Sequence, residues 1–172
     1  MLSVIVEMFG YSLIALLPIF ARGVLDVGAV GLGLLGSAGG VGALVSTLIV
    51  GSHSGYSRKG PLMVVSTFLS GLFLAGFALS PWYLLSLALI ALAGAMLMTY
   101  DVTLQTLLLV LSDGQMRGRV QGLFAFTIGS NFLGALLLGS IAAVLSAPLA
   151  LGLAGGILTA TTLQMRKTLE RL

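Results

Sequence analysis

Two carboxylates, Glu7 and Asp101, stand within long apolar stretches of this sequence. Gln105 follows Asp101 at a helical spacing that places both on one face, and Thr99, Tyr100 and Thr103 add polar groups nearby. Ionisable side chains at membrane depth are costly, and they usually mark ion or substrate paths. We therefore expect Asp101 to face a central cavity and to exchange protons or bind a cationic substrate. The alternative is that Asp101 lies near the cytoplasmic mouth and pairs with a loop arginine.

Two further polar residues are candidates for the same site. Glu7 lies roughly 10 Å from the cytoplasmic end of the first apolar segment, at about 1.5 Å per helical residue. It therefore presents the same choice between a functional carboxylate and a paired one. Asn131 in the fifth segment is more typical of a hydrogen bond between helices, worth about 1 kcal/mol, than of a ligand contact.

The sequence lacks the residues needed for metal binding, disulfide bonds, serine-protease catalysis or ATP binding. The chain has one histidine, His53, and no cysteine, so neither a metal site nor disulfides are expected. Serine-centred stretches occur at GSAGG (36–40) and GSHSG (51–55), but an intramembrane serine protease needs a Ser–His pair buried in the membrane. No GxxxxGK[ST] loop is present for ATP. We expect no enzyme, no catalytic residue and no cofactor.

The elements that position these residues follow from composition. Of 172 residues, 58% are hydrophobic and only 8% are charged, and the mean hydropathy is +1.16. A soluble domain of this size exposes too much surface to hide so many apolar side chains. Stretches of about 20 apolar residues suit helices that cross the ~30 Å hydrocarbon core of a bilayer. The net charge of +3 is spread over short loops, so no nucleic-acid partner is expected. The fold class is an all-α membrane protein.

Charged and turn-forming residues divide the chain into six crossings that form a single bundle over residues 1–172. The expected helices cover about 2–20, 27–50, 61–79, 82–111, 116–145 and 148–165. With six crossings, one side of the membrane receives seven basic residues: Arg58, Lys59, Arg117, Arg119, Arg166, Lys167 and Arg171. The other side receives only Arg22. The positive-inside rule then places both termini in the cytoplasm.

The loop SDGQMRGRVQG (112–122) carries two arginines at the start of a long uncharged run. Ser112 and Gln115 have capping-box spacing, which predicts a helix that begins at Asp113. Arg117 and Arg119 would then lie near the helix N-terminus, where the helix dipole disfavours cations. Such arginines need an acid or phosphate, and Asp113 is placed to pair with Arg117. The alternative is that both arginines only fix the orientation of the chain.

Glycines are concentrated in the second segment, where Gly36 and Gly40 form a GxxxG pair. Small residues let membrane helices approach closely, so we expect this pair to pack against a neighbouring helix. Such a contact permits sliding of helices, and static packing is the alternative.

Two stretches carry a family resemblance. TLQTLLLVLSDGQMRGRVQGLFAF (103–126) resembles the segment that joins helices 10 and 11 in the major facilitator superfamily, in the branch of enterobactin exporters and macrolide-efflux proteins. LLPIFARGVLDVGAVGLGLLGSAGGVGAL (16–44) is similar to the end of helix 7 and the start of helix 8. The matching positions are Thr103, Gln105, Asp113, Arg117, Gly118, Arg119 and Val120. The superfamily's loop signature is degenerate at 51–60, where Gly55 replaces its aspartate, so only a short basic turn is expected there.

The resemblance implies the C-terminal six-helix half of a twelve-helix transporter, built as two inverted three-helix repeats. It implies a bacterial cytoplasmic membrane and proton-coupled export of a small hydrophobic molecule, of the drug or siderophore class, by alternating access. It also gives Asp113, Arg117, Gly118 and Arg119 the role of a cytoplasmic gate. The expected partners are the bilayer, a small-molecule substrate, and a missing N-terminal half or a second copy. The alternative is a non-transporting six-helix subunit, or a remnant, that packs against a partner.

Overall fold

The computed structural model describes residues 2–52, 59–112 and 116–169, and every regular element in these ranges is a helix. The elements are α1 (Leu2–Ile5), the π-helix η1 (Val6–Gly10), α2 (Leu13–Gly23), α3 (Ala29–Ser52), α4 (Lys59–Leu79), α5 (Tyr83–Leu111), α6 (Arg117–Val144) and α7 (Ala147–Leu169). They form six stretches long and apolar enough to cross a membrane. The predicted all-α membrane fold of six spans is confirmed, and the chain is an integral membrane protein.

The longest helices are apolar on nearly every face, which is typical of spans surrounded by lipid or by other helices. On α6, only one stripe is buried, and its members recur every three or four residues: Phe124, Thr127, Ser130, Gly134 and Leu138. The other faces of α6 and most of α3 carry exposed leucine, isoleucine, valine and phenylalanine side chains. These two spans are the least covered of the six.

The first span differs from the expected continuous helix over 2–20. It consists of α1, η1 and α2, with a turn at Tyr11 and Ser12 between η1 and α2. The Ser12 hydroxyl donates to the Phe9 carbonyl oxygen at 2.9 Å, which satisfies one backbone acceptor at the break. Gly134 of α6 lies directly against the Met8 carbonyl, so that a Cβ atom at residue 134 would overlap it. The break is therefore fitted to a glycine on the neighbouring helix.

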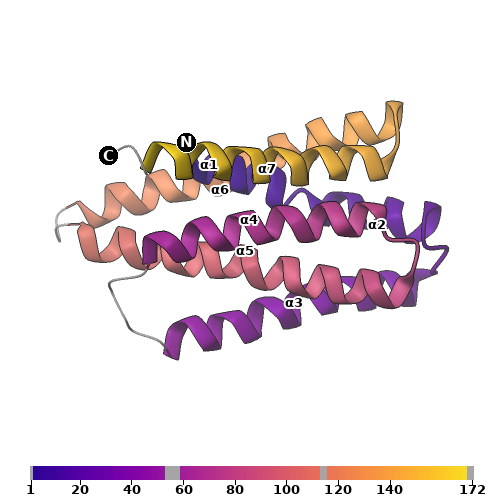
Figure 1. Cartoon of the computed structure of the whole chain (residues 1–172), viewed down its shortest axis with the longest axis horizontal. Coiled ribbons are helices and arrows are strands. Elements are labelled where there is room, and N and C mark those ends of the chain that lie inside the picture. The colour runs from indigo at the N-terminus through magenta and orange to yellow at the C-terminus, as the bar shows by residue number, and fades with distance from the viewer. Residues whose placement is uncertain (1, 53–58, 113–115, 170–172) are drawn as a thin grey trace.

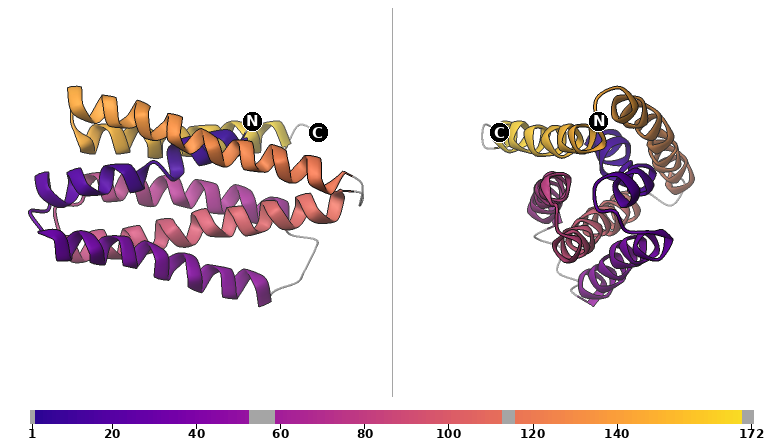
Figure 2. Two further views of the ribbon diagram at one scale, coloured as in Figure 1. Left: turned by 180° about the vertical axis from the view of Figure 1, so that it is seen from behind. Right: turned by 90° about the vertical axis from the view of Figure 1, so that its right-hand side faces the viewer.

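The broken span occupies the middle of the bundle. The end-on view in Figure 2 shows it between α6 and α7 on one side and α3 and α5 on the other. The rings of Phe20 in α2 and Phe77 in α4 lie 4.7 Å apart between centroids. In Figure 1, α3, α5 and α7 end at the same side of the bundle at which α4 and α6 begin. This common end contains Arg117 and Arg119 of α6, and the side of the membrane that it faces stays a prediction.

The close contact between α3 and α5 depends on glycines, but not on the predicted pair. A Cβ atom on Gly42 would overlap the Ala91 carbonyl, and one on Gly94 would lie 2.5 Å from the Gly39 carbonyl oxygen. Gly36 and Gly40 are exposed, and a Cβ atom on either would meet no described atom within 4 Å outside its own helix. The close contact with α5 thus uses Gly39 and Gly42, and packing of Gly36 and Gly40 against a further helix stays a prediction.

The start of α6 also differs from expectation. The helix begins at Arg117, with Met116 as its N-cap residue, and no side chain caps it. The Ser112 hydroxyl donates back to the Leu108 carbonyl oxygen of α5 at 2.5 Å, so the predicted capping by Ser112 is wrong. Asp113, Gln115 and the basic turn that contains His53 lie outside the described residues.

Candidate functional site

The two membrane carboxylates come together at the break in the first span. Asp101 on α5 is 8% exposed and Glu7 on η1 is 3% exposed. They lie near enough for their charges to interact. Because two buried carboxylates near one another are costly to ionise together, this arrangement favours a proton, or another cation, between the elements that carry them.

Asp101 is held by one hydrogen bond. The Tyr11 hydroxyl donates to Asp101 Oδ2 and so joins the turn of the first span to α5. Asp101 Oδ1 is buried and has no hydrogen-bond partner among the described residues. Most buried polar atoms in proteins are paired, so a carboxylate oxygen left open points to a role other than structure.

The polar neighbours of Asp101 on α5 are engaged elsewhere. The Thr99 hydroxyl lies 2.6 Å from that of Ser46 on α3, a hydrogen bond between the two helices. The Thr103 hydroxyl donates to the Thr99 carbonyl oxygen at 2.6 Å. These hydroxyls stabilise α5 and its contact with α3, and they leave Asp101 Oδ1 open.

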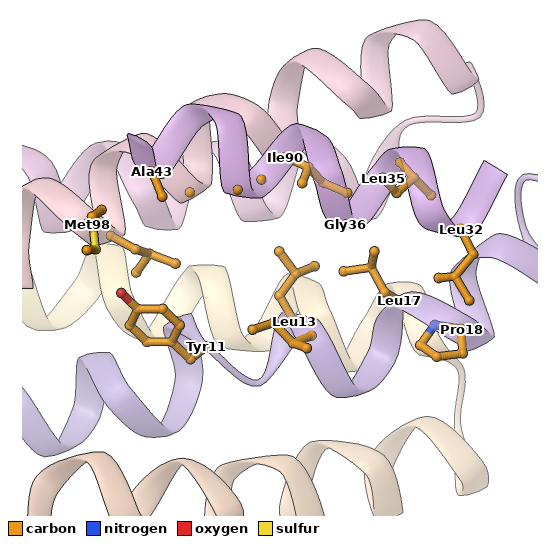
Figure 3. Close-up of a pocket in the computed structure, with 16 residues that line it drawn as sticks. Tyr11, Leu13, Leu17, Pro18, Leu32, Leu35, Gly36, Ala43, Ile90 and Met98 are labelled. Atoms are coloured by element: carbon orange, nitrogen blue, oxygen red, sulfur yellow. The ribbon is translucent and has the colours of Figure 1, made fainter. Parts of the chain in front are cut away.

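An apolar pocket of about 500 Å³ lies beside this cluster, between α2, α3 and α5. Figure 3 shows its lining, with Tyr11 toward one end and Leu32 and Pro18 at the other. Three α3 glycines, Gly36, Gly39 and Gly40, form part of one wall, and leucines from α2 and α3 form much of the rest. The size is in the range of small-molecule pockets, which are mainly apolar with few polar groups.

The structure does not bring all predicted site residues to this place. Gln105 shares α5 with Asp101 but is exposed, so it lies outside the buried cluster. Asn131 is half-buried on α6, and α6 contributes no residue to the pocket lining. The predicted grouping of Asp101 with Gln105 is therefore replaced by Asp101 with Glu7 and Tyr11.

The predicted gate residues lie at the start of α6. Arg117, Gly118 and Arg119 are exposed at the first turn of the helix. This location suits contact with phosphate headgroups or with a carboxylate, since guanidinium groups bind both. The pairing predicted for Asp113 lies outside the described residues.

Sequence reasoning missed Tyr11 and the pocket. The sequence does contain a signal for the first: Gly10, Tyr11 and Ser12 interrupt an otherwise apolar segment with a flexible residue and two hydroxyls. The pocket gave no such signal, because its walls come from three helices that are far apart in the sequence.

Comparisons with known proteins agree with this architecture. A model of the transmembrane secretion effector family matches residues 1–171. The chain is 35% identical to the enterobactin exporter EntS of Citrobacter koseri over 67% of its length and 28% of that protein. It is 31% identical to EntS of Shigella flexneri over 76% of its length and 32% of that protein. The match thus spans about a third or less of the length of these relatives.

No solved structure matches the chain significantly. The chain belongs to the transmembrane secretion effector family of major facilitator superfamily transporters.

Proposed function

We propose that this chain forms one half of a bacterial inner-membrane exporter, which moves a small apolar molecule outward by alternating access in exchange for protons. The observation that carries the proposal is the open Oδ1 atom of Asp101, buried at membrane depth and joined through Tyr11 to an apolar pocket. Most buried side-chain oxygens in proteins are paired, so an open one supports a role in binding a proton or ligand. The names of the relatives, enterobactin exporters, support export as the direction.

The lining of the pocket favours a particular kind of substrate. The wall is made of glycines, leucines and other apolar residues, and the Tyr11 hydroxyl at its end is already bonded to Asp101. A molecule with many hydroxyls would leave most of them unpaired in such a pocket, at a cost of about 1–3 kcal/mol for each. Within the drug and siderophore class, the described half therefore favours a substrate with few hydrogen-bonding groups.

Transport requires an opposite wall. The exposed apolar faces of α3 and α6, and the exposed Gly36 and Gly40 at the pocket, leave this bundle open on one side. We infer that a second six-helix unit, either an N-terminal half or a second copy, closes it. Such halves are related by an axis along the membrane normal.

The proposal is tested in proteoliposomes with an imposed pH gradient. The chain is reconstituted alone and together with a candidate N-terminal half, and movement of enterobactin and of a neutral lipophilic dye is measured. We expect gradient-driven movement of the dye, which has few hydrogen-bonding groups, and we expect Asp101→Asn to abolish it and Asp101→Glu to retain part of it. Exposed Asp26, changed to Asn, serves as the control.

Two results would contradict the proposal. Unchanged gradient-driven transport by Asp101→Asn would remove the carboxylate from coupling. Absence of transport in both preparations, with the second half shown to bind, would favour the non-transporting subunit.

A further inference from the structure

Tyr11 belongs to three features at once. It lies in the turn that breaks the first span, it lines the apolar pocket, and its hydroxyl donates to Asp101. We propose that Tyr11 couples occupancy of the pocket to the protonation of Asp101, so that a ligand and a proton exclude each other. This inference rests on the proposed exporter function.

The first step concerns the position of the Tyr11 ring. Figure 3 shows the ring toward one end of the pocket, in the row of lining residues that includes Leu13 and Leu17. Its hydroxyl is fixed on Asp101 Oδ2, so this hydrogen bond sets where the ring stands. The open volume of about 500 Å³ exists with the ring in this position.

The second step concerns what a proton does to that bond. A hydrogen bond to a charged carboxylate is roughly twice as strong as one between neutral groups. Asp101 Oδ1 is the open oxygen, and a proton from water that binds there neutralises the carboxyl group. Tyr11 is then held less firmly, and it lies in a turn rather than within a regular helix.

The third step concerns where a released ring goes. The pocket beside it is lined by leucines and glycines, which suits an aromatic ring. A ring that turns into this space removes volume from a ligand. A ligand that fills the space holds the ring outward, where its hydroxyl favours the charged carboxylate and the proton leaves to water. Ligand and proton therefore exchange, because the ligand and the released Tyr11 ring compete for the same pocket volume.

Other ionisable groups near Asp101 modify this exchange but do not replace it. Glu7 from η1 and Tyr100 from α5 both interact electrostatically with Asp101. Neither residue lines the pocket, so neither can transmit occupancy by contact. We expect Glu7→Gln to move the pH midpoint of the exchange while the exchange itself persists.

The experiment uses this chain alone in lipid nanodiscs with the neutral apolar photolabel 3-trifluoromethyl-3-phenyldiazirine. Labelling of the pocket residues Leu17 and Met98 is measured by mass spectrometry across a range of pH. It is divided by labelling of Phe126 and Phe132 on α6, which are 73% and 71% exposed and report the label in lipid. In the wild type we expect this ratio to rise with pH, by at most about tenfold per pH unit for one exchanged proton.

Three variants sharpen the test. Tyr11→Phe keeps the ring but loses the donor, and Asp101→Asn keeps the shape but loses the charge, so both should give a low ratio that does not change with pH. Tyr83→Phe is the matched control, because the Tyr83 hydroxyl donates to the Gly31 carbonyl oxygen at 3.1 Å and joins α5 to α3 without a carboxylate. It should titrate as the wild type does.

The inference is overturned if Tyr11→Phe titrates like the wild type, if the wild-type ratio is independent of pH, or if Tyr83→Phe abolishes the titration equally. Should Tyr11→Phe fail to fold, Asp101→Asn alone decides the outcome. A labelling ratio that still rises with pH in Asp101→Asn would show that Asp101 is not the group that takes up the proton, which overturns the inference. Failure of the exporter proposal is distinguishable. A labelling ratio that rises with pH, without transport, contradicts only the exporter function. Transport with a labelling ratio that does not change with pH contradicts only the role of Tyr11.

Discussion

Gly42 of α3 lies against the backbone carbonyl of Ala91 in α5, so closely that a Cβ atom at residue 42 would overlap it. Gly40 lies two residues earlier on the same helix and would meet no described atom of another element within 4 Å. Gly42 is therefore required for the contact between α3 and α5, whereas Gly40 is not.

The first prediction follows from this difference. Gly42→Ala should force α3 away from α5 and destabilise the bundle by about 1–3 kcal/mol, the usual cost of overpacking. Gly40→Ala should be neutral or slightly stabilising, because alanine is the better helix former. Unfolding in mixed micelles measures both, and equal destabilisation by the two variants would contradict the assigned contact.

Ser46 and Thr99 provide a second prediction. Their hydroxyls lie 2.6 Å apart in the buried contact between α3 and α5. Ser46→Ala should lower stability by about 0.6 kcal/mol, the average measured for hydrogen bonds between membrane helices, and by no more than about 1.7 kcal/mol. Ser37→Ala is the control, since the exposed Ser37 hydroxyl bonds to the Gly33 carbonyl oxygen of its own helix. A larger loss at Ser37 than at Ser46 would refute the prediction.

A third prediction concerns the bond between Tyr11 and Asp101. In a double-mutant cycle, Tyr11→Phe and Asp101→Asn should be non-additive by about 1 kcal/mol, because each change removes the same interaction. The cycle is measured by unfolding of the chain in detergent. Strict additivity would mean that the hydrogen bond contributes nothing to holding the first span.

The arginines at the helix ends give a fourth prediction. Arg119 lies in the first turn of α6, where the helix dipole disfavours a cation, and Arg22 lies in the last turn of α2, where the dipole favours one. In neutral detergent, Arg119→Gln should stabilise and Arg22→Gln should destabilise, each by about 0.3–1 kcal/mol.

The same substitution tests the proposed gate in an assembled transporter. The chain contains no cysteine, so single cysteines placed near each end report access from either side. Arg119→Gln should raise access from the cytoplasmic end at the expense of the other. Access that stays the same on both faces would count against a gating role.

The sequence was sufficient for the number and type of spans, because hydropathy integrates over about 20 residues and tolerates local errors. It was insufficient for the break at Tyr11, since the interruption by Gly10, Tyr11 and Ser12 is only three residues long and hydropathy averages over it. The GxxxG pair was insufficient to identify the glycines that contact α5 for a related reason: a motif fixes which residues share a helix face, whereas the neighbouring helix decides which face is packed.

The candidate site was predictable only in part. Asp101 and Glu7 were evident as charges in an apolar context, but their meeting depends on how η1 is placed against α5. Gln105 shared the helical spacing with Asp101, yet it is exposed, because the spacing does not say how far the buried face extends. Contacts across long sequence separations, such as Tyr11 with Asp101, leave no local pattern.

The break in the first span also bears on the order of biogenesis. Many hydroxyls in the later spans, such as those of Thr67, Ser70 and Thr162, donate to carbonyls of their own helix, so those segments can enter lipid with these groups satisfied. The first span instead contains Glu7, and its Tyr11 hydroxyl finds its acceptor 90 residues further along the chain. The N-terminal segment is therefore expected to reach its final depth only after α5 has been synthesised and inserted.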